Sequence, residues 1–506
     1  MADSKPKALV IIGGGTAGWM AANLIQHRWP DTQITLVESK TIGTIGVGEG
    51  STPYLKQFFQ LLDIADQDWM PACNATYKAG IRFCRWSQKP GYQSYFHPFY
   101  SRLDLAFGDA FFDQCNAQRR GAARAVHPDD YFVANRLAES ALAPLPVEDL
   151  GFEVDYGYHF DAGLLGELLK KRALAKGLTH RDAKIESVRL GSEGEVDCLL
   201  TETGERLKGD FYIDCSGFRG LLVNQTYQLA FKSYSDNLYN DAAVTLATGA
   251  DSGSGLAPET RSTALGYGWV WRIPLQNRVG NGYVYSSNFI TPAQAEAELA
   301  EHLKLNPKDE PAFQHIRFRT GRLEEHWHKN CLAVGLSQGF VEPLEATALM
   351  LVQFTLERFI AFYDGTRPLM HNTQTSYNAH VNDFIESIRD YIVTHYKCND
   401  RSDTDYWRAC REDAQISSRL RSFLDAWTQG ADFDAKLAQA KHQLAYLRPS
   451  WYVILAGMGC FPRNSAAQAT APQDNPVSRR ARQATHQLAK RYFGDHHQRL
   501  SDYLAR

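Results

Sequence analysis

The chain has 506 residues, 44% of them apolar and 22% charged, which is typical of a folded globular protein of two or three structural units. Fifty-four Lys and Arg against 57 Asp and Glu give a formal charge of −3, which disfavours nucleic acid and anionic membranes as partners. No uncharged apolar run approaches the roughly 18 residues of a membrane span, and the charged Met1–Lys7 does not resemble a signal peptide. Nine cysteines without a C-x-x-C pair predict neither a disulfide framework nor a metal site, so we expect a cytoplasmic protein.

A glycine-rich turn near the N-terminus predicts a nucleotide-binding fold. The apolar run Ala8–Ile12 is typical of a buried parallel strand, and the turn after it matches G-x-G-x-x-G before a helical stretch. Gln33–Val37 predicts a second strand, at whose end Glu38 can accept the ribose hydroxyls of an adenosine. The pattern indicates FAD or NAD before NADP, a purely structural turn being the alternative. The predicted contacts are Gly13, Gly15, Thr16, Ala17, Gly18 and Glu38.

The remaining pattern divides the chain into a strand-rich part and a helical part. Further strands are expected at Val188–Leu200, Phe211–Asp214, Val244–Thr248, Trp269–Pro274 and Cys331–Gly335. Helical periodicity marks Thr347–Tyr363, Tyr377–Tyr396, Asp413–Trp427, Phe433–Leu447 and Ser478–Tyr492, with a loop expected at 462–478. The fold class is therefore α/β. We expect a Rossmann-like body over residues 1–345, with an insertion near 85–160, and a mostly helical region over 346–506.

A short tryptophan motif gives the first link to a known family. Trp269-Val270-Trp271-Arg272-Ile273-Pro274 reads W-x-W-x-I-P, which resembles the signature of flavin-dependent halogenases, and in particular of the tryptophan-halogenase-like branch. Within the motif, Trp269, Trp271, Ile273 and Pro274 carry the resemblance. Other segments resemble that family at Gly46–Pro53, Tyr77–Phe83, Glu342–Thr347, His395-Tyr396 and Asp403–Arg408.

The resemblance implies a two-component enzyme. It implies a monooxygenase-type FAD domain, with Gly48, Asp214 and Gly335 as further cofactor contacts, and a substrate-facing insertion and helical region. FADH2, supplied by a separate NADH-dependent flavin reductase through transient contact or diffusion, would yield hypohalous acid from O2 and chloride or bromide. The acid would then halogenate a small electron-rich aromatic. A homodimer is left open.

The resemblance also assigns the chemistry to particular residues. Lys78 lies in an apolar, strand-like stretch, and a lysine amine is a nucleophile towards electrophilic halogen when deprotonated and a hydrogen-bond donor when charged. In the family such a lysine relays the halogen, and Glu345 would stabilise the cationic ring intermediate, with Glu342 as the rival for that role. The halide would bind at the backbone N–H groups of Thr347 and Ala348, at a helix start.

The substrate segments keep part of the family pattern and lose part of it. His97 and Phe99 match the pair that sandwiches an indole in tryptophan halogenases. Where enzymes of free tryptophan clamp the amino-acid end, this chain has Lys441, Tyr446 and Ser450 instead, and no acidic side chain. An unpaired buried ammonium is costly, so we expect an indole-type substrate rather than free tryptophan.

Two further departures concern the halide turn. Ala346 stands where the family has serine, and Ala348 where it commonly has glycine, which predicts a preference for bromide over chloride. Two other functions stay open from the sequence. One is a flavin-dependent aromatic hydroxylase, and the other is a non-catalytic FAD-binding protein.

Overall fold

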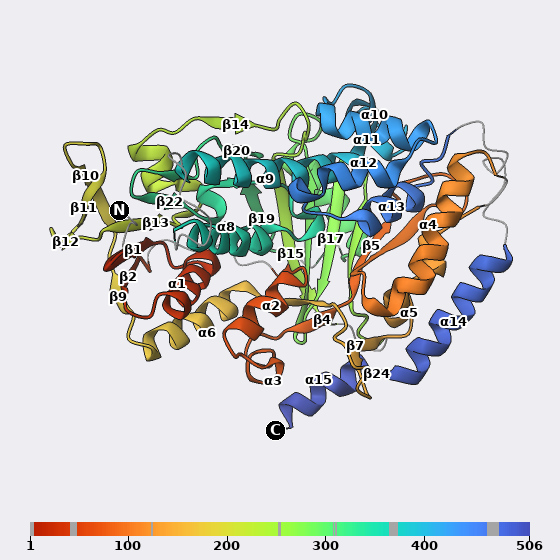
Figure 1. The fold of residues 1–506 in the computed structure, drawn as a ribbon, viewed down its shortest axis with the longest axis horizontal. Helices are drawn as coiled ribbons and strands as arrows, with labels where there is room; N and C mark the ends of the chain where they lie inside the picture. The colour runs from red at the N-terminus through yellow and green to blue at the C-terminus, as the bar shows by residue number, and fades with distance from the viewer. Residues whose placement is uncertain are drawn as a thin grey trace.

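A parallel sheet built around the first strand forms one half of the molecule (Figure 1). The structure is a computed structural model that describes residues 5–40, 48–122, 125–250, 255–306, 308, 311–363, 373–462 and 475–505. The sheet order is β21-β22-β13-β1-β2-β9, and all its pairs are parallel except β21 with β22. Its strands are β1 (Ala8–Ile12), β2 (Gln33–Glu38), β9 (Thr179–Asp182), β13 (Phe211–Asp214), β21 (Trp327–His328) and β22 (Cys331–Ala333).

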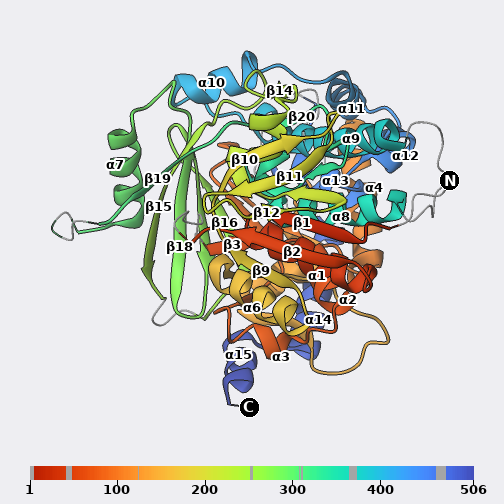
Figure 2. The ribbon, with the colours of Figure 1, turned by 90° about the vertical axis from the view of Figure 1, so that its left-hand side faces the viewer.

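Both faces of this sheet are covered, as the continuous apolar strands require. Alternate side chains of β1 enter different cores: Leu9 and Ile11 belong to the main core, and Val10 and Ile12 to a smaller one. The helices α1 (Thr16–Arg28), α6 (Ala162–Ala175) and α8 (Ala348–Tyr363) pack together on the main-core side. The smaller core lies under β10 (Ile185–Leu190), β11 (Val196–Thr201) and β12 (Arg206–Leu207) (Figure 2).

A second, seven-stranded sheet forms the other half, in the order β19-β15-β18-β17-β16-β5-β6. Its pairs are antiparallel except β5 with β16. The strands are β5 (Gly80–Cys84), β6 (Ser94–Pro98), β15 (Ala242–Gly249), β16 (Glu259–Ala264), β17 (Gly268–Pro274), β18 (Arg278–Tyr285) and β19 (Gln314–Arg317). Helix α7 (Pro292–Leu303) lies on its outer side (Figure 2).

A small sheet, β3-β8-β4, lies between the two halves. Its strands are β3 (Gly48–Gly50), β4 (Thr76–Lys78) and β8 (Gly157–Asp161), and β3 also contacts β17 and β18 of the large sheet. The remaining strands form the sheet β14 (Phe231–Ser233), β20 (Gly321–Leu323) and β23 (Gly339–Phe340), and the pair β7 (Leu142–Pro146) with β24 (Phe493–Asp495). The N-terminal helices outside the sheets are α2 (Tyr54–Leu61), α3 (Asp66–Trp69), α4 (Leu105–Arg119) and α5 (Val133–Glu139).

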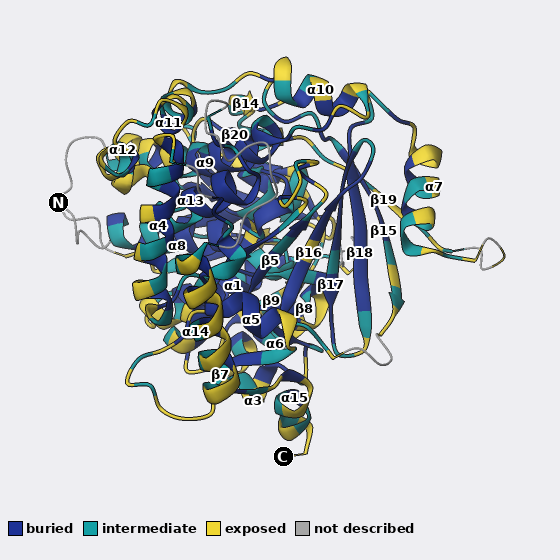
Figure 3. Ribbon diagram, turned by 90° about the vertical axis from the view of Figure 1, so that its right-hand side faces the viewer, coloured by how far each residue is buried: buried dark blue, intermediate teal, exposed yellow. Residues whose placement is uncertain are grey.

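The chain after α8 is mostly helical and wraps back over the earlier elements. Its helices are α9 (Thr373–Cys398), α10 (Asp405–Glu412), α11 (Ser418–Thr428), α12 (Phe433–Ala440), α13 (Arg448–Gly457), α14 (Pro476–Tyr492) and α15 (His496–Leu504). Helices α7, α10, α14 and α15 carry much exposed surface, whereas α9 and α13 lie within the buried interior (Figure 3). No described helix is both long and apolar enough to cross a membrane.

The α/β class and the Rossmann-like parallel sheet are confirmed, and several boundaries differ from the sequence prediction. Val188–Leu200 as a single strand is wrong, because Gly191–Glu195 turns the chain and β10 and β11 pair as a hairpin. The helix expected to reach Leu447 ends at Ala440, and the one expected from Asp413 begins at Ser418, whose N-cap Ser417 accepts a bond from Leu420 N–H. Most of the loop predicted at 462–478 lies outside the described residues, and α14 begins at Pro476.

Candidate active site

Three glycines of the first turn have three different environments. Gly13 has φ +106°, and its N–H donates to Val37 O at 2.8 Å, which closes the turn. A Cβ on Gly18 would lie 2.0 Å from Gly13 O, so Gly18 allows α1 to approach the strand end. A Cβ on Gly15 would meet nothing within 4 Å. The backbone at Gly15, at the N-terminus of α1, therefore faces an open cradle of the kind that takes a pyrophosphate.

An acidic side chain borders this cradle. Glu38 ends β2; its Oε2 lies over Gly14, where a Cβ would be 1.5 Å away. Its Oε1 accepts a bond from Lys170 Nζ at 2.6 Å and lies 2.9 Å from His180 Nε2. Open backbone, a helix start and a carboxylate at the end of the second strand fit the pyrophosphate and ribose of a dinucleotide, and hence FAD.

The other predicted cofactor residues fall into two groups. Gly335 (φ +75°) packs against Ala17, because a Cβ there would be 2.9 Å from the Ala17 Cβ, and Thr16 donates its hydroxyl to Ala162 O at 3.3 Å. These residues shape the cradle. The carboxylate of Asp214 is instead fully engaged with its own loop, where it accepts bonds from the N–H and hydroxyl of Ser216 and from Leu222 N–H and Val223 N–H.

The predicted relay lysine is a buried cation without a hydrogen-bond partner. Lys78 ends β4 and is 0% exposed, and its Nζ forms no hydrogen bond within the described residues. The Nζ atom lies 5.5 Å from the ring centre of Phe99. Burial lowers the pKa of Lys78 to about 7, against the opposing charge of Glu345. A lysine of this kind is present as both amine and ammonium near neutral pH.

Glu345 is buried and sits between two histidines. Its Oε2 lies 3.0 Å from His97 Nδ1, and its Oε1 lies 3.1 Å from His395 Nε2. Burial acts to raise the pKa of Glu345, but the two imidazoles outweigh it and hold that pKa at about 2. Glu345 is therefore a fixed negative charge beside Lys78.

The rival glutamate has a different set of partners. Glu342 Oε2 accepts bonds from Tyr396 OH at 2.6 Å, Asn240 Nδ2 at 2.9 Å and Trp269 Nε1 at 3.0 Å. Burial raises the pKa of Glu342. This glutamate thus anchors the first tryptophan of the W-x-W-x-I-P strand, and Glu345 is the carboxylate that acts on Lys78.

The rest of the W-x-W-x-I-P strand faces β3 and β4. Trp271 lies against Gly282, where a Cβ would be 2.0 Å from its ring. A Cβ built on Gly48 of β3 would lie 3.5 Å from both Ile273 and Leu275, so Gly48 packs against this strand. Pro274 O accepts a bond from the Thr76 hydroxyl at 2.8 Å, which ties the motif to the strand of Lys78.

Aromatic side chains line the predicted substrate region. Tyr446 stacks on Tyr391 of α9 at 3.9 Å between ring centres, and its buried hydroxyl has no hydrogen-bond partner in the described chain. The His97 ring lies 5.9 Å from Tyr391 and 6.4 Å from Tyr446. Ser450 takes part through its carbonyl, which accepts a bond from Tyr391 OH at 3.0 Å.

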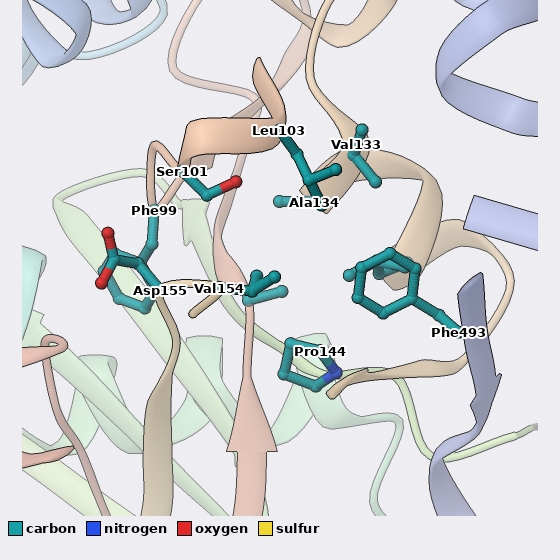
Figure 4. Close-up of a pocket in the computed structure, with 11 residues that line it drawn as sticks. Phe99, Ser101, Leu103, Val133, Ala134, Pro144, Val154, Asp155 and Phe493 are labelled. Atoms are coloured by element: carbon teal, nitrogen blue, oxygen red, sulfur yellow. The ribbon is translucent and has the colours of Figure 1, made fainter. Parts of the chain in front are cut away.

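Phe99, whose ring lies next to Lys78, also lines a mostly apolar pocket (Figure 4). Asp155 and Ser101 supply the polar side chains of its wall, and Phe493 of β24 closes the side opposite Phe99. Lys78 is not part of this wall, although the next residue, Ala79, is. His97 does not line this pocket either, so the pocket does not lie between His97 and Phe99.

The predicted halide turn precedes α8. Thr347 is buried and Ala348, the first residue of α8, is exposed. Ala346 adopts the left-handed conformation with φ +55°, which is unfavourable for a residue with a side chain. The turn is thus strained at the position where the family carries serine.

The sequence patterns do not predict Tyr391, His159 or Thr260 as residues of this site, and they give His395 no role. Tyr391 and His395 are one helical turn apart, so their spacing could have predicted that they lie on the same face of a helix. His159 and Thr260 come to Lys78 only through strand pairing, because β8 pairs with β4 and β16 lies beside β5.

Comparisons with known proteins show which family this chain resembles. The family model described as tryptophan halogenase matches residues 8–474. Tryptophan 6-halogenase SttH from Streptomyces toxytricini is 36% identical over 84% of this chain and 85% of its own. BrvH, a flavin-dependent halogenase from Brevundimonas sp. BAL3, is 34% identical, with a TM-score of 0.83 over 99% of both chains. Xcc4156, a flavin-dependent halogenase from Xanthomonas campestris, is 33% identical, with a TM-score of 0.83 over 98% of both.

Proposed function

Because this chain belongs to the tryptophan halogenase family of flavin-dependent enzymes, we propose that it halogenates an indole-type aromatic through Lys78. Bound FADH2 supplies two electrons that, with O2 and a halide ion, yield hypohalous acid and water. A separate flavin reductase renews FADH2 in this family. The observation that carries the proposal is a buried lysine that has no hydrogen-bond partner in the described chain and whose charge interacts with the ionised carboxylate of Glu345.

In the proposed step the Lys78 amine attacks the halogen of hypohalous acid. The N–halogen bond forms, the O–halogen bond breaks, and the released hydroxide takes the proton from nitrogen to leave as water. The aromatic carbon then attacks the halogen, so the nitrogen recovers a proton and the ring loses one. We place this route before simple hydrogen bonding by the ammonium, since burial lowers the lysine pKa to about 7.

Glu345 acts on the ring. Its carboxylate stays ionised, because the neighbouring imidazoles hold its pKa at about 2, and it therefore opposes the positive charge that develops on the aromatic. With so low a pKa it is a weak base.

The substrate part of the proposal rests on the residues beside the aromatic pair Tyr391 and Tyr446. The segment Lys441–Ser450 contains no carboxylate. The nearby Asp434 is engaged in a two-point ion pair with Arg448 and accepts a further bond from Tyr452 OH. A free amino acid would need a carboxylate for its ammonium, so an indole without that group suits these surroundings better. We extend the proposal to bromide over chloride, because the strained turn at Ala346 differs from the family pattern.

The deciding experiment compares wild type with Lys78→Met. Each protein is supplied with FAD, a flavin reductase, NADH, catalase, indole and either halide, and products are detected by their halogen isotope pattern. We expect wild type to halogenate and Lys78→Met to lose at least about 100-fold of that rate, with flavin oxidation unchanged. Lys56→Met is the matched control, because Lys56 is also buried but is paired with Glu153 and Val154 O.

Two results would reject the proposal. If Lys78→Met is as active as wild type in the presence of catalase, the relay role fails. A product that gains one oxygen and no halogen would instead identify an aromatic hydroxylase.

A further inference from the structure

A chain of hydrogen bonds runs behind Lys78, from the W-x-W-x-I-P strand to β16. The Thr76 hydroxyl donates to Pro274 O at 2.8 Å, and its Oγ1 lies 3.1 Å from His159 Nδ1. On the other side of the ring, His159 Nε2 lies 2.8 Å from Thr260 Oγ1. His159, on β8, is 0% exposed, so these are the bonds that fix its ring.

The partners determine the protonation of this imidazole. A carbonyl can only accept, so the single hydroxyl proton of Thr76 is committed to Pro274 O and Thr76 Oγ1 must accept from His159 Nδ1–H. Burial first, and the positive charge of Lys78 second, hold the pKa of His159 well below its usual value, so the ring is neutral. Nε2 is therefore unprotonated, and the Thr260 hydroxyl donates to it.

Thr260 is left with lone pairs and no proton to give, next to a lysine that has donors and no acceptor. Both groups border the same point. A Cβ built on Gly50 would lie 3.2 Å from Lys78 Nζ, 3.4 Å from Thr260 Oγ1 and 3.5 Å from His159 Cδ2. Gly50 keeps this point free of a side chain, and contact between Nζ and Thr260 needs a rotation of the lysine side-chain torsions into that space.

We propose that Thr260 is the positioning residue of Lys78, accepting one of its N–H bonds, and that His159 and Thr76 fix the direction of that hydrogen bond. Since Thr260 cannot donate to the nitrogen, the lone pair of the neutral amine points away from it and stays available for halogen. This inference rests on the relay role of Lys78 proposed above.

The experiment compares Thr260→Val, which removes the hydroxyl at nearly equal volume, with Thr260→Ser, which keeps it. Halogenation and flavin oxidation are measured over pH 5–9 with catalase present. We expect Thr260→Val to lose about 10- to 100-fold in halogenation, as for a lost hydrogen bond to a charged group, with flavin oxidation kept. The pH of half-maximal halogenation should move lower, because the lost acceptor favoured the ammonium. Thr260→Ser should recover most of the rate.

Two controls separate positioning from packing. Thr263→Val makes the same change on the same strand and should leave both rates near wild type. His159→Leu should resemble Thr260→Val, and the double variant should lose no more than either single one, since both act through one hydrogen bond.

The inference is overturned if Thr260→Val keeps the wild-type rate and pH profile, or if Thr260→Ser is as impaired as Thr260→Val. Either result is separable from failure of the relay role, which Lys78→Met reports on its own. If Lys78→Met halogenates normally, the relay role and this inference fall together.

Discussion

Lys78 and Glu345 are both buried, and their two charges have different origins. The carboxylate is held ionised by His97 and His395, whereas the lysine has only that carboxylate to favour its charge and burial to oppose it. A buried ammonium without hydrogen bonds is unfavourable, and the pKa of about 7 expresses the balance of the two effects. Lys78 is thus set to exchange a proton near neutrality.

The pH dependence of halogenation separates the two ways in which Lys78 could act. An amine nucleophile becomes available as the pH rises through about 7, so halogenation per flavin oxidised should increase through that pH. A hydrogen bond from the ammonium would give the opposite slope.

Glu345→Gln removes the charge that raises the lysine pKa, so the midpoint should fall below 7. The same variant should slow halogenation by roughly 30- to 1,000-fold, from about 2–4 kcal/mol of lost charge stabilisation. An unchanged midpoint in Glu345→Gln would mean that the two groups do not interact.

At the scale of elements, two substitutions in the turn between β1 and α1 should separate an effect on protein stability from an effect on FAD binding. Gly15→Ala places a methyl group in open space at an extended residue (φ −72°), so thermal unfolding of the protein without FAD should shift by no more than about 2 °C. FAD binding should weaken by about 10-fold or more, because the methyl group occupies the cradle. Gly18→Ala should instead lower the melting temperature itself, since its Cβ would overlap Gly13 O. Flavin fluorescence titration and calorimetry measure the two quantities. Equal FAD affinity in Gly15→Ala and wild type would place the pyrophosphate elsewhere.

The elements that could be predicted from sequence are those whose cause is local. The strand, the glycine turn and Glu38 follow one another within about 30 residues, so the sequence pattern alone predicts how they are arranged. The hairpin at Gly191–Glu195 was hidden because its two strands read as one apolar–polar run. Helix α13 was not predicted from the sequence, because it is a short, nearly continuous apolar stretch without helical periodicity.

The candidate site shows where such reasoning ends. Lys78 and Glu345 could be named because short motifs carry them, but their partners come from strands and helices far along the chain. Thr260 comes near Lys78 through the pairing of β16 with β5, and His395 reaches Glu345 through the packing of α9. Neither pairing can be derived from spacing. Asp214 shows the reverse case, a predicted cofactor contact whose carboxylate the fold uses to hold its own loop.

At the scale of the whole molecule, the two large sheets carry different parts of the candidate site. The parallel sheet presents the cradle at the carboxyl ends of its strands, and the seven-stranded sheet carries His97 on β6 and Trp269 on β17. The small sheet with Lys78 lies between them, and the helices after α8 cover the aromatic residues. In the proposed function, hypohalous acid made at the flavin would pass from one half to the other. We expect the aromatic substrate beside Tyr391 and Tyr446, next to the segment Lys441–Ser450 that lacks a carboxylate.

The substrate prediction belongs to this second half. Binding of a free amino acid needs partners for an ammonium and a carboxylate. Burying either group without a partner costs about several kcal/mol of binding free energy. The segment after α12 offers the exposed Lys441 for a carboxylate, while Asp434 is already paired with Arg448 and Tyr452. The aromatic pair Tyr391 and Tyr446 can still hold a flat ring, with about 0.5–1.5 kcal/mol per aromatic contact beyond area burial.

We therefore expect kcat/KM for indole to exceed that for free tryptophan by about 10-fold or more, measured with each halide under identical FADH2 supply. Tryptamine and indole-3-propionate, which each carry one of the two charges, tell which partner is missing: an ammonium without a carboxylate to pair with should make tryptamine the poorer of the two. A higher kcat/KM for free tryptophan than for indole would show that the amino-acid end is recognised by residues other than Lys441–Ser450.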